Sequence, residues 1–208
     1  GYEIATHYKP GARGLEIGGD WYDVIHDEHR MVVSVGDVSG NGVDAAAMMG
    51  RLRLLAEVEF RRGAEVIDVF TLLDQVCRDR AEFATMLAVE IRFETDDACI
   101  WSAGHLPAAY IGQGAAHLVE LDAMPPLGYL RSTTSDPATL RLEEGCSLLL
   151  YTDGLVERRG ESMDHSLDRL VNTLRSKDTA SAAVDGVMSQ LARDSEDDVA
   201  VIAVQRLG

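Results

Sequence analysis

Apolar and polar residues alternate along much of the chain, and this two-residue period predicts a protein built largely of β-strands. The predicted strands are short, and segments containing Gly, Pro or charged residues separate them. The strands at 83–94 and 98–104 are separated by a short polar break and are expected to form an antiparallel hairpin. In chain order the predicted strands cover residues 3–8, 15–25, 31–38, 83–94, 98–104, 108–112, 117–121, the run just before Asp153, and 199–204.

Four segments show a helical period instead. Residues 43–62 repeat apolar side chains every three or four positions until Gly63 interrupts the pattern, and residues 65–80 do the same. Residues 167–174 and 183–191 form a second pair of amphipathic segments. Many short strands with helices inserted in pairs favour antiparallel sheets covered by helices over a parallel, doubly wound fold.

The composition is that of a globular protein of ordinary size. Of the 208 residues, 46% are hydrophobic and 26% are charged, which allows a substantial core. We expect a single domain over residues 1–208, and, because the chain enters strand-like sequence directly at Gly1, one cut from a longer polypeptide. No apolar run approaches the roughly 20 residues that span a bilayer, and no basic and apolar leader opens the chain. We therefore predict a cytoplasmic protein without membrane insertion.

The charge and the cysteines narrow the classes of partner and site. The net charge is −16 and no basic stripe is present, so we expect no binding to nucleic acid or to anionic membranes. An anionic substrate would need a local positive charge, which metal ions can supply. Cys77, Cys99 and Cys146 lie far apart in apolar segments without CxxC spacing. We interpret them, like Trp101, as core residues of a protein in a reducing compartment.

Four aspartates stand at the ends of strongly apolar strands. Asp20 ends IGGD, Asp37 ends VVSVGD, Asp153 follows SLLLYT, and Asp197 opens DDVAVIAV. A buried carboxylate is costly unless it is paired, neutralised or bound to a metal. Four converging carboxylates would suit Mg²⁺ or Mn²⁺, whereas zinc prefers Cys and His clusters that the sequence lacks. Spacing alone leaves open the simpler alternative that each acid forms a local turn.

Seven motifs, in order along nearly the whole chain, resemble those of the metal-dependent protein phosphatase (PPM) family. The similarity is to its bacterial sporulation and stress-response branch, the SpoIIE-like or RsbU-like phosphatases. The motifs are IGGDWYDV at 17–24, GDVSGNGVDAAAMM at 36–49, FATMLAVEI at 83–91, SAGHLP at 102–107, PPLGY at 125–129, LLLYTDGLVE at 148–157 and DDVAVIAV at 197–204.

The resemblance implies an α+β fold, a four-layer α-β-β-α sandwich of two mainly antiparallel sheets flanked by helical hairpins. It also implies two divalent cations, Mn²⁺ or Mg²⁺, that activate a water to hydrolyse phosphoserine or phosphothreonine on a partner protein. Matched by motif, the implied metal ligands are Asp20, Asp37, the backbone carbonyl of Val38, Asp153 and Asp197, with Asp37 bridging both ions.

The resemblance also implies a substrate and a pathway. The expected partner is a phosphorylated anti-anti-sigma protein of the STAS type, whose dephosphorylation would control an alternative sigma factor. Sensor, kinase or STAS domains could be attached in the full-length chain. Arg13 and Lys9, just upstream of IGGD, are candidates for binding the phosphate and are equally candidates for ordinary surface charges.

Other polar residues near the motifs have simpler interpretations. Asp44 is expected to favour the first turn of the helix that begins near Val43. Asp23 and Asp198 are interpreted as solvated or supporting acids rather than ligands. His105 has a pKa range that suits acid catalysis, but the resembling family uses this histidine in a structural turn, which we expect here.

The chain departs from the family pattern at two positions. Asn41 replaces the usual histidine of GDVSGHG, and Ala200 replaces the threonine that commonly follows DDV. Neither is an implied ligand, so we expect activity to be altered rather than lost.

Two function classes remain open from the sequence. The first is a metal-dependent serine/threonine phosphatase, which the presence of all four aspartates favours. The alternative is a weakly active or inactive pseudophosphatase that acts as a binding module for a phosphoprotein or a regulatory domain. A Mg²⁺-dependent nucleotide binder has no support, because the chain has no Walker-type glycine loop with a lysine.

Overall fold

The computed structural model describes residues 1–11, 18–129, 136–193 and 195–208. Contacts between Cα atoms divide the chain into two compact units. The central unit comprises Leu15–Leu106 and Glu120–Arg141, and the terminal unit comprises Gly1–Gly14, Pro107–Val119 and Leu142–Gly208. Each unit has its own antiparallel sheet and its own pair of helices.

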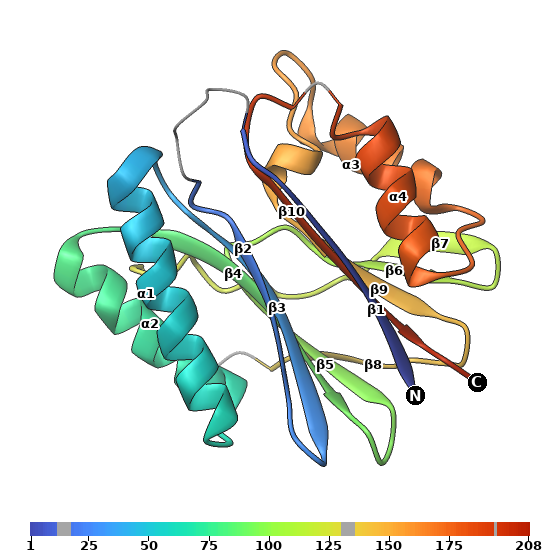
Figure 1. Ribbon diagram of the computed structural model, residues 1–208, viewed down its shortest axis with the longest axis horizontal. Helices are drawn as coiled ribbons and strands as arrows, with labels where there is room; N and C mark the ends of the chain where they lie inside the picture. The colour runs from blue at the N-terminus through green and yellow to red at the C-terminus, as the bar shows by residue number, and fades with distance from the viewer. Residues whose placement is uncertain (12–17, 130–135, 194) are drawn as a thin grey trace. The chain divides into compact units, whose positions relative to one another are not determined.

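The central unit contains a five-stranded antiparallel sheet in the order β2-β3-β4-β5-β8. Helices α1 and α2 pack together, and α1 lies against β2 and β3 (Figure 1). The buried apolar faces of both helices and of the inner strands form one core cluster. The bounds are β2 Trp21–His26, β3 Arg30–Val38, α1 Gly42–Arg61, α2 Val66–Arg80, β4 Ala84–Arg92, β5 Asp97–Ala103 and β8 Ala138–Arg141.

The terminal unit contains the second sheet, in the order β1-β10-β9-β6-β7. Helices α3 and α4 pack together, and α4 lies against β1 and β10 (Figure 1). β10 is hydrogen-bonded on both edges and is almost wholly buried. The bounds are β1 Tyr2–Lys9, β6 Ala109–Gly112, β7 Ala115–Leu118, β9 Ser147–Tyr151, α3 Met163–Leu174, α4 Ala180–Gln190 and β10 Val199–Arg206, with a 3₁₀ turn at Asp153–Leu155.

This architecture confirms the expected α+β class, with two antiparallel sheets and paired helices. The predicted hairpin of β4 and β5 is also confirmed. In α1, the periodic pattern ends as expected near Gly63, which has a φ of +86° that favours glycine. No helix in the described part of the chain is long and apolar enough to cross a membrane.

The strand predicted at 15–25 is wrong in its first part. β2 begins only at Trp21, and Gly18 to Asp20 lie outside the strand. The backbone carbonyl of Gly19 accepts a hydrogen bond from the N–H of Val38 at 3.2 Å. The glycines therefore form a bend that brings this segment against the end of β3.

Two further differences concern short strands. The strand predicted at 117–121 lies instead at Ala115–Leu118, because Gln113 and Gly114 both have positive φ and form a two-residue hairpin turn after β6. Strand β8 was not predicted, since its four residues show too short an alternation and it is defined by pairing with β5. Cys77 and Cys146 are buried as expected, but Cys99 and Trp101 are partly exposed.

Candidate metal centre

The central unit holds Asp20, Asp37 and Val38 at one end of its sheet. Asp37 and Val38 are the last two residues of β3, and Asp20 is buried immediately before β2. A Cβ atom on Gly19 would lie 2.5 Å from the carbonyl oxygen of Val38 and 3.1 Å from Oδ1 of Asp37. Only a glycine permits this approach, so Gly19 allows the Asp37 carboxylate and the Val38 carbonyl to gather beside the Asp20 segment.

The terminal unit holds Asp153 and Asp197 beside the paired ends of β9 and β10. Asp153 opens the 3₁₀ turn after β9, and Asp197 precedes β10. Thr152, which directly follows β9, is fully buried. Its backbone N–H donates to the carbonyl of Ala200 at 3.0 Å and its hydroxyl accepts from the Ala200 N–H at 2.9 Å. A Cβ on Gly154 would lie 3.4 Å from that of Asp197.

The electrostatics of this second pair are unfavourable without a cation. Burial raises the pKa of Asp153 above its ordinary value, and the nearby Asp197 and Glu157 carboxylates raise it further. In the described ranges, no Lys or Arg forms an ion pair with Asp153 or Asp197. Adjacent carboxylates without a basic partner are the donor chemistry that suits a hard divalent cation.

The acids thus occur as one pair in each unit. Within the residues that the structure describes, no group of three or more His, Cys, Asp and Glu side chains is placed to hold a metal ion. The complete ligand set of Asp20, Asp37, Val38, Asp153 and Asp197 therefore stays a prediction.

Lys9 has a different environment from the one expected for a phosphate ligand. Its ammonium group donates to three backbone carbonyls, those of Ala192 at 2.5 Å and of Arg193 and Ser195 at 3.3 Å each. An ammonium group has three N–H donors, so a phosphate would have to displace one of these bonds. Arg13, the other candidate, lies outside the described residues.

Asp198 is buried rather than solvated. Its Oδ1 accepts hydrogen bonds from the backbone N–H of Gly11 at 2.8 Å and from the hydroxyl of Tyr8 at 3.3 Å. Its own N–H donates to Oδ1 of Asp197 at 2.9 Å. Asp198 is thus a supporting acid beside Asp197, and the solvated alternative is wrong.

Asp23 and Asp44 also have local roles that need no bound metal. Asp23 accepts from the Val24 N–H and pairs with Nε of Arg53 in α1 at 3.1 Å. Asp44 lies in the first turn of α1, as expected.

His105 is buried and lies in the segment between β5 and β6. Its Nδ1 lies 2.7 Å from Oγ1 of Thr85, and its backbone N–H and carbonyl both bond to the hydroxyl of Ser102. Thr85 is the register partner of Asp37 in the sheet. His105 therefore supports the strand beside Asp37.

The residues that sequence reasoning missed are those that hold the acids in place. Gly19 and Thr152 stood inside the quoted motifs, next to Asp20 and Asp153, and their motif positions were the available signal. Ser195 and Tyr8 carry no such signal, because their contacts with Asp197 and Asp198 form only on folding.

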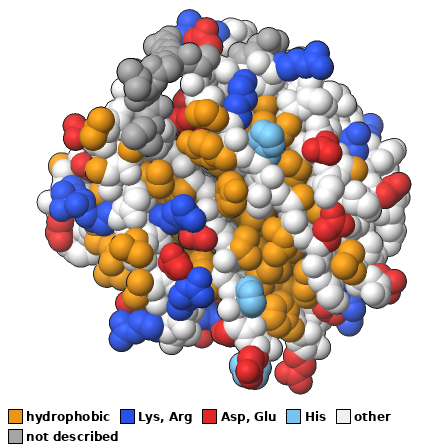
Figure 2. Space-filling model, in the orientation of Figure 1, with side chains coloured by type: hydrophobic (Ala, Val, Ile, Leu, Met, Phe, Trp, Pro, Cys, Tyr) orange, Lys and Arg blue, Asp and Glu red, His pale blue; other side chains and the backbone are white. Residues whose placement is uncertain are grey.

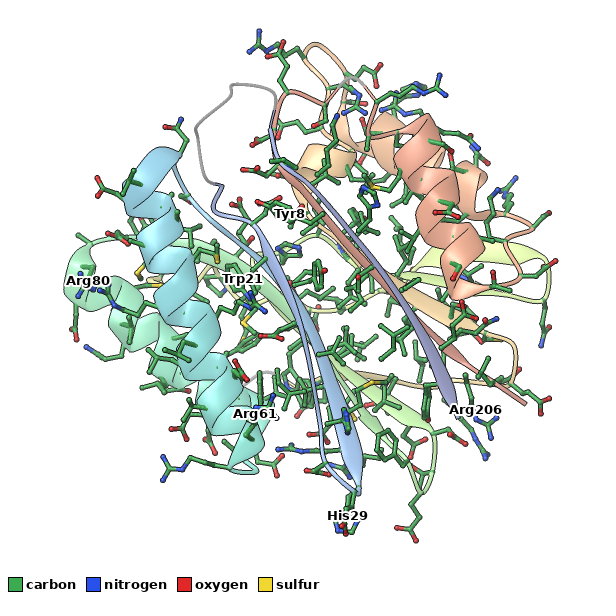
Figure 3. All side chains as sticks on the ribbon, viewed as in Figure 1. Tyr8, Trp21, His29, Arg61, Arg80 and Arg206 are labelled. Atoms are coloured by element: carbon green, nitrogen blue, oxygen red, sulfur yellow. The ribbon has the colours of Figure 1, made fainter. Side chains whose placement is uncertain are left out.

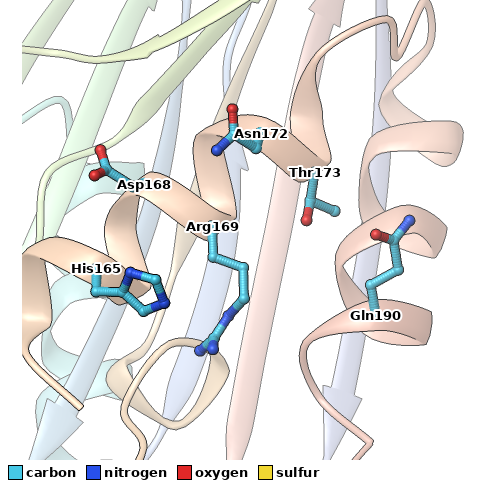
Figure 4. A pocket seen from close by; sticks show the side chains of 6 residues that line it. All are labelled: His165, Asp168, Arg169, Asn172, Thr173 and Gln190. Carbon is cyan, nitrogen blue, oxygen red and sulfur yellow. The ribbon is translucent and has the colours of Figure 1, made fainter.

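A pocket of about 360 Å³ lies elsewhere in the terminal unit, between α3 and α4 (Figure 4). None of the predicted ligands lines it. One guanidinium nitrogen of Arg169 pairs with Glu161 at 2.7 Å. The lining side chains are all polar: His165, Asp168, Arg169, Asn172, Thr173 and Gln190.

Comparison with known proteins identifies clear relatives. The family described as Stage II sporulation protein E (SpoIIE) matches residues 27–207. Phosphoserine phosphatase RsbP of Bacillus subtilis (strain 168) is 28% identical over 164 residues, which cover 74% of this chain and 40% of RsbP. The chain thus spans less than half the length of that relative.

Solved structures show the same fold. The RsbU and RsbW domains of Rv1364c from Mycobacterium tuberculosis match with a TM-score of 0.87 and 29% identity, over 100% of this chain and 62% of that one. RsbX in complex with magnesium matches with a TM-score of 0.78 and 18% identity, over 98% of this chain and 94% of that one. The second likeness is one of fold alone.

Proposed function

Because this chain belongs to the SpoIIE family, we propose that it is a phosphatase domain that hydrolyses phosphoserine or phosphothreonine on a regulatory partner protein. Two divalent cations, Mn²⁺ or Mg²⁺, are the proposed cofactors. The observation that carries the proposal is the placement of Asp153 beside Asp197 at paired strand ends, with its pKa raised and no described basic partner.

The proposed ligands are Asp20, Asp37 and the Val38 carbonyl in the central unit, and Asp153 and Asp197 in the terminal unit. When bound, the cations supply positive charge that neutralises phosphoryl oxygens and acidifies water for in-line attack. The chain's own contribution is to hold carboxylate and carbonyl oxygens at the ends of rigid strands, where Gly19 and Thr152 restrict their positions.

Two of the three cysteines, Cys77 and Cys146, are poor candidates for a competing nucleophile. Burial, and then the nearby Asp74 carboxylate, raise the pKa of Cys77 to about 12, so its thiol stays protonated at neutral pH. Cys146 is also buried. Direct attack by water is therefore favoured over a covalent intermediate on either of these two cysteines.

The proposed substrate is a phosphorylated anti-anti-sigma protein of the STAS type, and its dephosphorylation would control an alternative sigma factor. The names of the relatives support this proposal: one is a phosphoserine phosphatase, and one structure joins RsbU and RsbW domains. Attached sensor, kinase or STAS domains in the full-length protein are part of this proposal, since both relatives extend beyond the matched region.

The test is Mn²⁺-dependent phosphate release from an aryl phosphate and from a phosphoserine STAS protein. We expect release that a chelator abolishes and that Asp37→Asn reduces to the chelated background, because a carboxylate that would hold the cations is lost. Asp44→Asn is the matched control, since it removes an exposed acid from the nearby first turn of α1. Folded wild-type protein that binds Mn²⁺ but releases no phosphate would favour the pseudophosphatase instead.

A further inference from the structure

The described residues between α4 and β10, 191–193 and 195–198, form no helix or strand, and Asp197 is one of them. Contacts from elsewhere in the chain must therefore define its position. Lys9 ends β1 and pairs in register with Val199, the first residue of β10. Its ammonium group bonds the carbonyls of Ala192, Arg193 and Ser195 within this segment. The Lys9 ammonium group thus binds three carbonyl groups of this segment, and these carbonyls do not belong to any helix or strand.

Ser195 connects the backbone that Lys9 binds to the backbone of Asp197. Ser195 is buried, and its hydroxyl donates to the carbonyl of Asp197 at 3.2 Å and accepts from the Asp197 N–H at 3.3 Å. The carbonyl of Ser195 is itself bound by Lys9. A shift of the Lys9 ammonium would therefore move the backbone to which the Asp197 carboxylate is attached.

Asp198 also contacts the Asp197 carboxylate. Tyr8, near the end of β1 (Figure 3), and Gly11 both donate to Oδ1 of Asp198. A Cβ on Gly11 would lie 2.9 Å from the carbonyl oxygen of Glu196, so the two backbones are in close contact there. With this side chain held, the Asp198 N–H donates to Oδ1 of Asp197 at 2.9 Å.

We propose that Lys9 and Asp198 are positioning residues for Asp197, and that Lys9 acts on the metal centre through the loop rather than by touching phosphate. The inference rests on the proposed function, in which Asp197 is a metal ligand. The contacts join residues about 190 positions apart in the chain, so the end of β1 helps to hold the second pair of acids.

The test compares Lys9→Met with Lys177→Met, which makes the same chemical change at a lysine outside these contacts. The readouts are Mn²⁺ affinity by titration calorimetry, thermal unfolding in chelator, and the KM for a phosphoprotein at saturating Mn²⁺. We expect Lys9→Met to weaken Mn²⁺ binding about tenfold, the lower end of the range for groups that support metal ligands. KM at saturating Mn²⁺ should not change, and Lys177→Met should bind Mn²⁺ like the wild type.

Ser195→Ala and Asp198→Asn keep the test informative if Lys9→Met does not fold. Ser195→Ala removes only the hydroxyl that bonds the Asp197 backbone, and it should weaken Mn²⁺ binding in the same direction. Variants that unfold at lower temperature in chelator but bind Mn²⁺ like the wild type would overturn the proposal. A raised KM with unchanged Mn²⁺ affinity in Lys9→Met would overturn it too, and would identify Lys9 as a phosphate ligand.

These outcomes are separate from those of the function itself. Wild-type protein that binds Mn²⁺ while the variants match it would reject the positioning role and leave the phosphatase proposal intact. Wild-type protein that binds no Mn²⁺ would reject both.

Discussion

At the scale of single residues, the buried hydroxyl of Thr152 lies next in sequence to Asp153, a carboxylate whose pKa is raised by burial. Thr152 bonds the backbone of Ala200 through both its amide and its hydroxyl, and so closes the end of the β9–β10 pair. Asp153 follows directly, so this pairing fixes the backbone position from which its carboxylate projects. The two acids are thus held close although they repel each other, which is an arrangement that a cation would stabilise.

This repulsion predicts a specific dependence on pH. The folded pKa of Asp153 is raised above the ordinary value of 3.8. As pH rises, Asp153 therefore loses its proton in the unfolded chain at a lower pH than in the folded protein. Without metal, the contribution of Asp153 to stability is then lost as pH rises from 3.8 through the raised folded pKa. We expect Asp153→Asn to be more stable than the wild type in chelator at neutral pH, and this advantage to shrink in acid.

Thermal unfolding of both proteins over a pH series, with chelator and with Mn²⁺, measures this effect. Added Mn²⁺ should stabilise the wild type more at neutral than at acidic pH, because protons compete with the metal for the carboxylates. Asp153→Asn should lose most of that metal-dependent gain. A wild type and variant whose difference in chelator does not change with pH would contradict the prediction.

At the scale of elements, α1 is a 20-residue helix that follows directly after β3, the strand that carries Asp37. Its buried stripe includes Met48, Leu52 and Phe60, and it packs on β2 and β3. Asn41 stands at the N-cap position, but its side chain makes no capping hydrogen bond. The helix therefore depends on tertiary packing more than on its own end for stability.

Glycine at position 50 weakens this helix. Gly50 is exposed in the middle of α1, and an added Cβ would meet no atom within 4 Å. We expect Gly50→Ala to raise the free energy of unfolding by about 0.5–1 kcal/mol, because alanine restricts the unfolded chain and favours the helix. Gly63→Ala is the matched control and should destabilise the protein, since Gly63 has a φ of +86°.

Chemical denaturation of both variants in chelator checks this prediction without interference from metal binding. An unchanged or lowered midpoint for Gly50→Ala would show that the helix needs the flexibility or the small size of glycine at this position.

At the scale of the whole molecule, charge is the dominant feature. The chain has 35 acidic and 19 basic residues and a net charge of −16. On the face seen in Figure 2, Lys and Arg side chains are interspersed with Asp and Glu. Local pairs such as Arg53 with Asp23 offset some repulsion, but the excess of negative charge opposes the compact state.

Salt should therefore stabilise the protein. We expect the midpoint of thermal unfolding in chelator to rise as NaCl is increased from low ionic strength to about 0.15 M, where the screening length falls to about 8 Å. Differential scanning fluorimetry at constant pH is sufficient to measure it. A midpoint that falls with added NaCl would mean that attractive ion pairs outweigh the net repulsion.

The sequence predicted most elements, because periodicity is a local property. The helices at 43–62 and 65–80 and the strand at 31–38 appear within a few residues of their expected bounds. Prediction failed where glycines or pairing partners decide the structure, as at Gly18 to Asp20 and in β8. The environment of Asp198 was also missed, since its partners Tyr8 and Gly11 come from the opposite end of the chain.

By itself, then, the sequence determined the α+β class, the order of the motifs and the four candidate acids. Only the tertiary structure decided which residues hold those acids: Gly19 against Val38, Thr152 against Ala200, and Lys9 against the loop before Asp197. The physical reason is that hydrophobic periodicity acts over neighbouring residues, whereas these hydrogen bonds and close backbone approaches form between segments that only folding brings together.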